Sequence, residues 1–190
     1  MYYPKIIGEK VFLAAIDPLD SHVYTKWVND MDVAVGVGLA PKIISETSER
    51  GILERLRDSG ENFAIVNKET GEVIGNCGFP KMNSIDRCLE VGIFIGDKNY
   101  WNGGYGKEAL SLLCDFGFNV LNMHNISLRV FSFNKQAIRC YEKVGFKEVG
   151  RLRETKLFAG EKYDEIIMDI LEHEFESPYI KKIIDKKLNK

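Results

Sequence analysis

The feature that most constrains this chain is a glycine-rich segment between an apolar run and an amphipathic helix pattern. The segment extends from Gly96 to Ala109 and directly follows the apolar residues 89–95. Glycines allow a backbone to adopt positive φ and to approach a ligand closely. The first amides of the following helix lack intrahelical acceptors and lie at the positive end of its dipole. The segment therefore predicts a strand-to-helix turn that binds an anion such as a diphosphate.

Two common phosphate motifs fit this segment poorly. A P-loop would require glycine at Trp101 and serine or threonine at Glu108, so that interpretation fails at both positions. The spacing G-x-G-x-x-A that begins at Gly104 satisfies the dinucleotide-binding pattern. However, the preceding strand ends too early, and the next strand, residues 126–131, contains no carboxylate. A third interpretation is that the glycines serve only a tight turn between a strand and a helix.

Hydrophobic periodicity on both sides of this segment predicts a mixed α/β fold. Asp17-Pro18 is typical of a helix start, and Ser45 and Gly60 are a plausible N-cap and helix end. A single mixed, mostly antiparallel central sheet flanked by helices is therefore expected, in one domain over residues 1–172. The predicted order is a strand (11–16), two helices, three antiparallel strands (63–66, 73–79, 89–95), a helix, a strand (126–131), a helix capped by Asn134 and stopped by Gly145, and two strands (149–157, 165–171). The central helix is expected to carry its apolar residues on one face, namely Ala109, Leu112, Leu113, Phe116 and Val120.

The C-terminal tail, residues 173–190, has the pattern of an amphipathic helix rather than of a separate domain. Its apolar residues fall on one helical face and its lysines lie elsewhere. Packing on the chain's own domain or on a second copy in a homodimer is one interpretation. Attachment to a membrane surface is another, although such a short basic helix is only weakly diagnostic. The apolar residues are Tyr179, Ile180, Ile183, Ile184 and Leu188.

Charge and cysteine usage exclude several classes of protein. A formal net charge of -2 argues against a nucleic-acid-binding protein, which usually has a strong basic excess. The 4 cysteines form no C-x-x-C pair, so their spacing matches neither a zinc site nor a disulfide framework, and no metal is expected. Reduced thiols indicate a reducing compartment. No leader-like segment and no apolar run of membrane-spanning length is visible, so the sequence predicts a cytoplasmic protein without a membrane partner.

Two motifs resemble the GNAT superfamily of N-acetyltransferases. Residues 100–106, Y-W-N-G-G-Y-G, resemble its pyrophosphate loop, in particular that of the branch containing ribosomal-protein N-terminal and spermidine acetyltransferases. Trp101 replaces the glutamine or arginine usual in the superfamily, and Asn102-Gly103 replaces the usual Gly-Lys. Residues 134–146 resemble the family's N-x-x-A-x-x-x-Y-x-K-x-G-F segment. The resemblance covers roughly residues 11–171 and leaves the tail unexplained.

This resemblance implies the acyl-CoA N-acyltransferase fold, with acetyl-CoA as co-substrate and no metal. The strand end at Phe94, Ile95 and Gly96 would pair with the pantetheine amides as an added strand does. Asn134 would bond the pantetheine arm. The loss of the usual loop lysine removes one cation near the phosphates, a charge that Lys107 could supply. The residues implied to surround the diphosphate are Trp101, Asn102, Gly103, Gly104, Tyr105, Gly106 and Lys107.

Direct attack of an amine on a thioester relies mainly on positioning and electrostatics. Tyr141 occupies the position of the family's thiolate-protonating tyrosine; the alternative is an amphipathic core residue whose hydroxyl has another partner. For the base, the resemblance implies Glu90, which lies on the strand before the loop, where some family members carry a glutamate acting directly or through water. Glu90 also lies within an otherwise apolar strand, and burial would raise the pKa of a glutamate toward useful values. The alternative for Glu90 is a structural salt bridge or a solvent-exposed edge.

The acceptor is less constrained than the donor. A protein N-terminus or a small amine such as a polyamine fits the resemblance, and the acyl chain is not readable from the sequence. Acidic residues of the N-terminal helices would attract a cationic amine or form an ordinary solvated surface; they are Asp30, Asp32, Glu46 and Glu49. A non-catalytic acyl-CoA-binding regulatory domain is the alternative from a different functional class.

Overall fold

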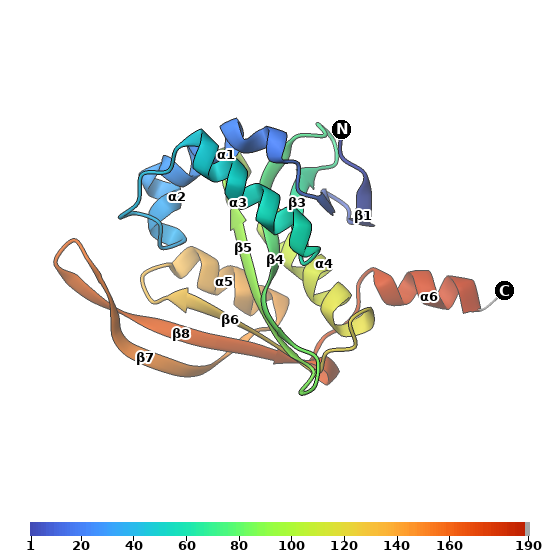
Figure 1. Cartoon of the computed structure of the whole chain (residues 1–190). Helices are drawn as coiled ribbons and strands as arrows, with labels where there is room; N and C mark the ends of the chain where they lie inside the picture. Colours follow the sequence, from blue (N-terminus) through green and yellow to red (C-terminus); the bar gives the residue numbers. More distant parts are fainter. Residues whose placement is uncertain (189–190) are drawn as a thin grey trace. The chain divides into compact units, whose positions relative to one another are not determined.

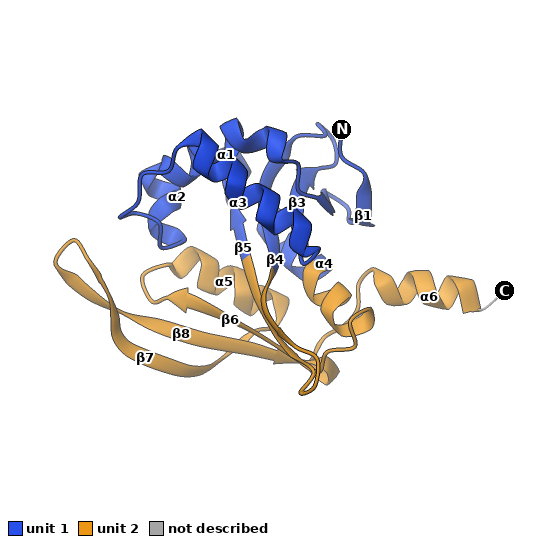
Figure 2. Ribbon diagram, viewed as in Figure 1, with its two compact units in different colours: residues 1–78, 93–112 blue, residues 79–92, 113–190 orange. Residues whose placement is uncertain are grey.

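The computed structural model describes residues 1–188, which form two compact units (Figure 2). Unit 1 comprises Met1–Gly78 and Ile93–Leu112, and unit 2 comprises Phe79–Gly92 and Leu113–Lys190. The chain passes between them along β4 (Val73–Asn83), β5 (Cys88–Ile95) and α4 (Tyr105–Asn119).

The strands belong to a single mixed 8-stranded sheet, which confirms the predicted fold class (Figure 1). Its strand order is β1-β2-β3-β4-β5-β6-β8-β7. The strands β5 and β6 pair in parallel, whereas β1–β2, β2–β3, β3–β4, β6–β8 and β7–β8 are antiparallel. The strands not yet defined are β1 (Pro4–Ile7), β2 (Val11–Ala15), β3 (Asn62–Asn67), β6 (Asn125–Phe131), β7 (Lys147–Phe158) and β8 (Glu161–Leu171).

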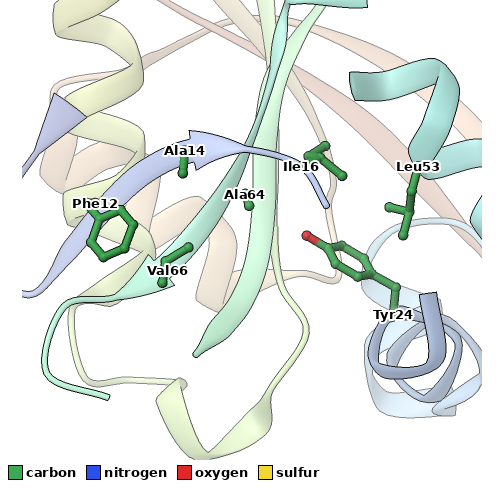
Figure 3. Packing of buried hydrophobic residues seen from close by; sticks show 7 residues of the cluster. All are labelled: Phe12, Ala14, Ile16, Tyr24, Leu53, Ala64 and Val66. Atoms are coloured by element: carbon green, nitrogen blue, oxygen red, sulfur yellow. The ribbon is translucent and has the colours of Figure 1, made fainter. Parts of the chain in front are cut away.

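The core of unit 1 lies where two helices pack on β2 and β3 (Figure 3). Antiparallel register places Phe12 opposite Val66 and Ala14 opposite Ala64, so alternate side chains of both strands share one face. Tyr24 is fully buried against this cluster, and its hydroxyl donates to the carbonyl of Gly75 at 3.1 Å. That bond satisfies the polar group that burial would otherwise leave unpaired. The cluster consists of Phe12, Ala14, Ile16, Tyr24, Leu53, Ala64 and Val66.

The helices of unit 1 begin and end largely where local signals place them. A 3₁₀ turn (Pro18–Asp20) leads into α1 (Ser21–Asn29), as Asp17-Pro18 predicts. In α3 (Glu46–Ser59) the Ser45 hydroxyl accepts from the Ser48 amide at 3.2 Å, and Gly60 ends the helix at φ 69. Two elements escaped prediction, α2 (Met31–Gly36) and β1, because their 6 and 4 residues are too short for a periodic pattern.

Unit 2 contains α5 (Lys135–Val144), whose two ends were predicted correctly. The Asn134 side chain accepts from the Ala137 amide at 3.1 Å, and Gly145 closes the helix at φ 117. The long strands β7 and β8 form the predicted closing pair. Val120, predicted on the buried face of the central helix, lies beyond the end of α4 and is 45% exposed. That prediction was wrong because α4 ends at Asn119.

The C-terminal tail is helical over a shorter range than predicted. Residues Glu172–Glu174 form a 3₁₀ turn, and α6 extends only over Ile180–Leu188. The prediction of a helix that starts at residue 173 was therefore wrong at its beginning, where Ser177 and Pro178 precede the helix. Residues 189–190 lie outside the described part of the chain. Of the predicted apolar face, Ile180 is buried, whereas Ile183, Ile184 and Leu188 are exposed.

Candidate active site

The glycine-rich loop of unit 1 is held against the end of β5. Asp97 accepts from the Asn99 amide at 2.9 Å and starts a 3₁₀ turn (Lys98–Tyr100). The Trp101 indole then donates to the carbonyl of Ile95 at 2.9 Å. Trp101 therefore fixes the loop to the strand that precedes it, a structural role that the resemblance did not assign to it.

Backbone conformation requires special residues at the centre of this loop. Asn102 and Gly104 have φ values of 59 and 84, in the left-handed region that asparagine and glycine tolerate best. A Cβ at Gly103 would lie 2.8 Å from the ring of Tyr105. Replacing the family's usual Gly-Lys by Asn-Gly thus preserves a tight turn although it removes a positive charge.

The start of α4 leaves backbone donors available at the end of this loop. The Glu108 amide makes the first helical bond, to the carbonyl of Gly104 at 3.0 Å. The amides of Tyr105, Gly106 and Lys107 precede that bond and have no intrahelical acceptor. A Cβ at Gly106 would meet only Ile95 Cγ1, at an ordinary 3.5 Å. Nothing in the described chain requires glycine at 106, so its missing side chain leaves room for a ligand at these donors.

The end of β5 supplies the backbone that was expected to pair with pantetheine. The parallel ladder with β6 stops at the pair Glu90–Ser127, so Phe94 and Ile95 lie outside it. The Gly96 amide donates to the carbonyl of Ile74 at 2.9 Å. Since the Ile95 carbonyl already accepts from Trp101, these residues offer fewer unpaired groups than the simple added-strand picture assumes.

An aromatic group beside this strand end was missed by the sequence reasoning. A Cβ at Gly96 would lie 2.2 Å from the ring of Trp27, so the indole of α1 packs directly on that backbone. Trp27 also contacts Tyr24 and Phe94 edge-on, with ring centroids 5.1 and 6.3 Å apart. In the sequence, Trp27 belongs to the apolar side of a helix and Gly96 to the end of a strand. No local pattern indicates that these two residues contact each other.

Several of the acidic residues considered for amine recognition already have partners. The Lys98 ammonium lies 2.7 Å from Asp30 and 2.8 Å from Asp32. The Lys98 contact lowers the pKa of Asp30, and the two carboxylates raise the pKa of Lys98. Glu46 accepts from the Ser21 hydroxyl at 3.4 Å. Glu49 is buried, and burial raises the pKa of its carboxyl group.

In unit 2, α5 carries the two motif residues Asn134 and Tyr141. The Oδ1 atom of Asn134 caps the helix, whereas its Nδ2 atom donates to no acceptor within residues 1–188. Burial raises the pKa of Tyr141 well above its ordinary value, and the neighbouring Cys140 adds to that shift. The ring lies 6.3 Å from that of Phe146. Tyr141 therefore keeps its proton at neutral pH, as a proton donor must.

Glu90, also in unit 2, lies between two cations. Its Oε2 atom is 3.0 Å from Lys81 Nζ and 3.4 Å from Arg129 Nε, and its side chain is 19% exposed. Arg129 also pairs with Glu165 at 3.0 Å. These contacts support the salt-bridge alternative, because both cations compete with a substrate amine for the carboxylate.

The predicted site residues thus fall into two groups. The loop residues and Phe94–Gly96 share unit 1, whereas Glu90, Asn134 and Tyr141 belong to unit 2. Among residues 1–188, no group of three or more His, Cys, Asp or Glu side chains is arranged to hold a metal ion. No helix in that range is long and apolar enough to cross a membrane. The cytoplasmic location and the homodimer stay predictions.

Comparison with known proteins shows the family of the chain. Residues 10–147 match the family model described as an acetyltransferase (GNAT) domain. The chain is 27% identical over 172 residues to an uncharacterized N-acetyltransferase p20 of Bacillus licheniformis, covering 88% of this chain and 96% of that protein. It is 30% identical over 122 residues to the spermidine N(1)-acetyltransferase of Escherichia coli K12, covering 64% of each protein.

Solved structures share the fold of this chain. A GNAT-family acetyltransferase from Bacillus anthracis superposes with a TM-score of 0.78 at 22% identity, over 92% of this chain and 100% of that one. Spermidine N-acetyltransferase from Vibrio cholerae, solved with CoA and spermine, gives a TM-score of 0.77 at 24% identity, over 88% and 98%. The chain belongs to the GNAT acetyltransferase family. It is an acetyl-CoA-dependent N-acetyltransferase, with acetyl-CoA as its co-substrate.

Proposed function

We propose that this enzyme acetylates a primary amine of a small polycation, with polyamines of the spermidine type as first candidates and protein N-termini as the second. The observation that carries the acetyl-CoA part of this proposal is the set of amides at Tyr105, Gly106 and Lys107, which have no intrahelical acceptor and lie beside an exposed glycine turn. Such donors at a helix start suit the diphosphate of CoA. Binding there would fix the donor, and the acceptor would attack its thioester directly.

The proposed chemistry is a direct acetyl transfer, and each residue role lies within the unit that carries the residue. The amine nitrogen attacks the acetyl carbon, the C–S bond breaks, and the leaving thiolate takes the proton of the Tyr141 hydroxyl. Solvent then returns a proton to the Tyr141 oxygen. In unit 2, Asn134 Nδ2 would donate to a pantetheine carbonyl. In unit 1, the Phe94–Gly96 backbone would pair with pantetheine amides. The proton released by the amine passes to water, or to Glu90 if its ion pairs open. Because direct transfer needs no covalent enzyme intermediate, positioning supplies most of the catalysis.

Two facts support a polyamine acceptor. Relatives from Escherichia coli and Vibrio cholerae bear the name spermidine N(1)-acetyltransferase, at 30% and 29% identity. The N-terminal helices also carry carboxylates, although Lys98 partly neutralises Asp30 and Asp32. A protein N-terminus is favoured by a second likeness, a ribosomal-protein-serine acetyltransferase-like structure from Vibrio cholerae with a TM-score of 0.70 at 19% identity.

A panel of amines assayed with acetyl-CoA by free-thiol release tests this proposal. Spermidine and spermine should release thiol faster than peptides with free N-termini. Faster turnover of peptides would overturn the polyamine assignment, and an absence of release with every amine would overturn the transferase mechanism. Replacing acetyl-CoA by longer acyl-CoA donors in the same assay measures the acyl preference.

The role of Tyr141 is tested by Tyr141→Phe, with Tyr163→Phe on β8 as a control. Loss of a general acid should lower kcat by about a hundredfold or more while CoA affinity changes little. Because burial raises the pKa of Tyr141 above its ordinary 10.0, the wild-type rate should show no alkaline loss from this group below that pH. An unchanged kcat in Tyr141→Phe removes the hydroxyl from the mechanism.

A further inference from the structure

The diphosphate loop lacks the lysine that the resemblance leads one to expect, and a lysine from another element of unit 1 contacts it instead. Lys10 lies in the turn between β1 and β2. Its ammonium donates to the carbonyl of Gly103 at 2.8 Å. It also lies 5.4 Å from the centroid of the Tyr105 ring and 3.8 Å from the position that a Cβ on Gly104 would occupy. Lys10 therefore lies beside the exposed Gly103 and Gly104 and the first residue of α4, Tyr105.

The turn that carries Lys10 is held against the first turn of α4. The Glu108 carboxylate accepts from the Glu9 amide and from the Lys10 amide, the latter at 3.0 and 3.1 Å. Gly8 makes this fit possible, because a Cβ there would lie 2.1 Å from Glu108 Oε1. On its other side the turn receives a bond from the Lys68 ammonium to the Gly8 carbonyl, at 3.0 Å. These contacts fix the backbone from which the Lys10 side chain extends.

The same turn also provides hydrogen-bond donors for the negatively charged carboxylate of Glu108. A carboxylate in the first turn of α4 would repel a diphosphate bound at that helix start. Here its oxygens accept from backbone amides of the β1–β2 turn, which directs them to that turn. The amides of the turn thus partly compensate the negative charge of Glu108, and Lys10 of the same turn supplies a positive charge beside the loop.

Other lysines near the loop are less suited to this task. Lys98 is paired with both Asp30 and Asp32, so its charge is already compensated. Lys107 is exposed, and it makes no hydrogen bond or ion pair to the loop within residues 1–188. Lys10 forms no ion pair with a carboxylate in the same range, and its one recorded hydrogen bond leaves further donors on the ammonium.

We propose that Lys10 is the cation that binds the CoA diphosphate in this enzyme, taking the place of the loop lysine that Asn102-Gly103 lacks. This inference rests on the proposed use of the loop for CoA. The Lys10 ammonium orders the turn through Gly103 and adds a charge-assisted donor to the backbone amides of α4. Glu108 acts as a positioning residue for the segment that carries Lys10.

Titration calorimetry with CoA tests this role in Lys10→Met, with Lys68→Met as the matched control. Lys68 bonds to the same turn but does not contact the glycine loop, so its variant reports any general loosening of the turn. Lys10→Met should bind CoA about tenfold more weakly, as expected for the loss of one hydrogen bond to a charged group. Its CoA affinity should also depend less on ionic strength than that of the wild type. Lys10→Arg should retain most of the affinity, and Lys68→Met should resemble the wild type.

A donor without a diphosphate separates binding from a merely structural effect. Acetyl-pantetheine lacks that group, so Lys10→Met should use it with the same kcat/KM as the wild type while KM for acetyl-CoA rises. The proposal is overturned if Lys10→Met binds CoA like the wild type, if Lys68→Met shows an equal loss, or if acetyl-pantetheine turnover falls in parallel. It is also overturned if Lys107→Met, rather than Lys10→Met, carries the loss. Wild-type protein that binds no CoA contradicts the proposed function itself, a result distinct from these.

Discussion

The starts of α4 and α6 differ in whether the chain itself provides acceptors for the first amides of the helix. Each helix begins with amides that lack intrahelical acceptors. At α6 the chain supplies the acceptors: Asp115, fully buried, accepts from the amides of Tyr179 and Ile180, both at 2.9 Å. The Ser177 hydroxyl accepts from the Lys181 amide at 3.0 Å and donates to Asp115 at 2.6 Å. At α4 the corresponding amides follow an exposed glycine turn and precede the first helical bond.

This difference shows that the residues around a helix start determine whether its first amides bond within the chain or stay available to a ligand. Asp115 provides negative charge that complements the dipole of α6, so no external anion is needed there. At α4, Gly104 and Gly106 present no side chain that could take that place. The acid of its first turn, Glu108, bonds instead to the amides of Glu9 and Lys10. An anionic ligand is the natural acceptor for the remaining donors.

The strongest way to break the comparison is to give α4 an acidic side chain of its own with Gly106→Asp. The site has room for a Cβ, and an acid in the first turn suits the helix dipole, so stability should change little. CoA affinity should fall by at least about a hundredfold, because a carboxylate would occupy the donors and repel the diphosphate. Titration calorimetry measures the loss, and Gly106→Ala separates size from charge. Equal affinity in Gly106→Asp and the wild type would contradict the assigned role of these amides.

Removing the acceptor from α6 tests the other half of the comparison. Asp115→Ala leaves the amides of Tyr179 and Ile180 and the hydroxyl of Ser177 without this partner. Unfolding free energy should fall by about 2–3 kcal/mol, the usual cost of buried unsatisfied groups. Urea titration followed by circular dichroism measures it, with Asp185→Ala, an exposed acid of α6, as control. CoA affinity should stay the same. A loss no larger than that of the control would show that Asp115 does not hold the tail.

Changing the loop backbone sharpens the claim about its conformation. Gly104 has φ 84, which costs a residue with a side chain roughly 1 kcal/mol. Gly104→Ala should therefore lower stability by about that amount and weaken CoA binding severalfold. Thermal unfolding with and without CoA separates the two effects. The reference is Gly106→Ala, whose backbone is not in the left-handed region. Identical unfolding midpoints in the two variants would argue against strain at 104.

The smallest expected effect concerns the hydroxyl that assists Asp115. Ser177→Ala removes one bond to that carboxylate and one from the Lys181 amide, while the two bonds from Tyr179 and Ile180 remain. A loss of about 1 kcal/mol is expected, in the range of a lost helix cap. Hydrogen exchange at Lys181 should accelerate more than exchange within α3. No change at Lys181 would assign its protection to other groups.

Local signals in the sequence predicted much of the fold. Ser45, Gly60, Asn134 and Gly145 each mark a helix end through bonds to neighbouring residues or through positive φ, so a short stretch of sequence is enough to place them. The strands predicted at residues 63–66 and 73–79 also followed from their apolar residues. The glycine loop was placed correctly because its constraints are local too.

Contacts between residues far apart in the sequence could not be predicted from these local signals. The start of α6 depends on Asp115 of α4, which accepts from two amides at that start. In the sequence, Asp115 cannot be distinguished from the other polar residues of α4. Lys10 carries no motif, and its position beside Gly103 follows only from the pairing of β1 with β2 and from Glu108. The Glu90 ion pairs likewise join residues on separate strands.

The central claim is that the loop and the first amides of α4 bind the diphosphate of CoA. Titration calorimetry of the wild-type protein with CoA, in parallel with dephosphorylated pantetheine, tests it most directly. The account predicts measurable heat and saturable binding for CoA, with much weaker binding of pantetheine because it lacks the diphosphate. Equal affinity for both compounds, or no binding of CoA by folded protein, would contradict the account.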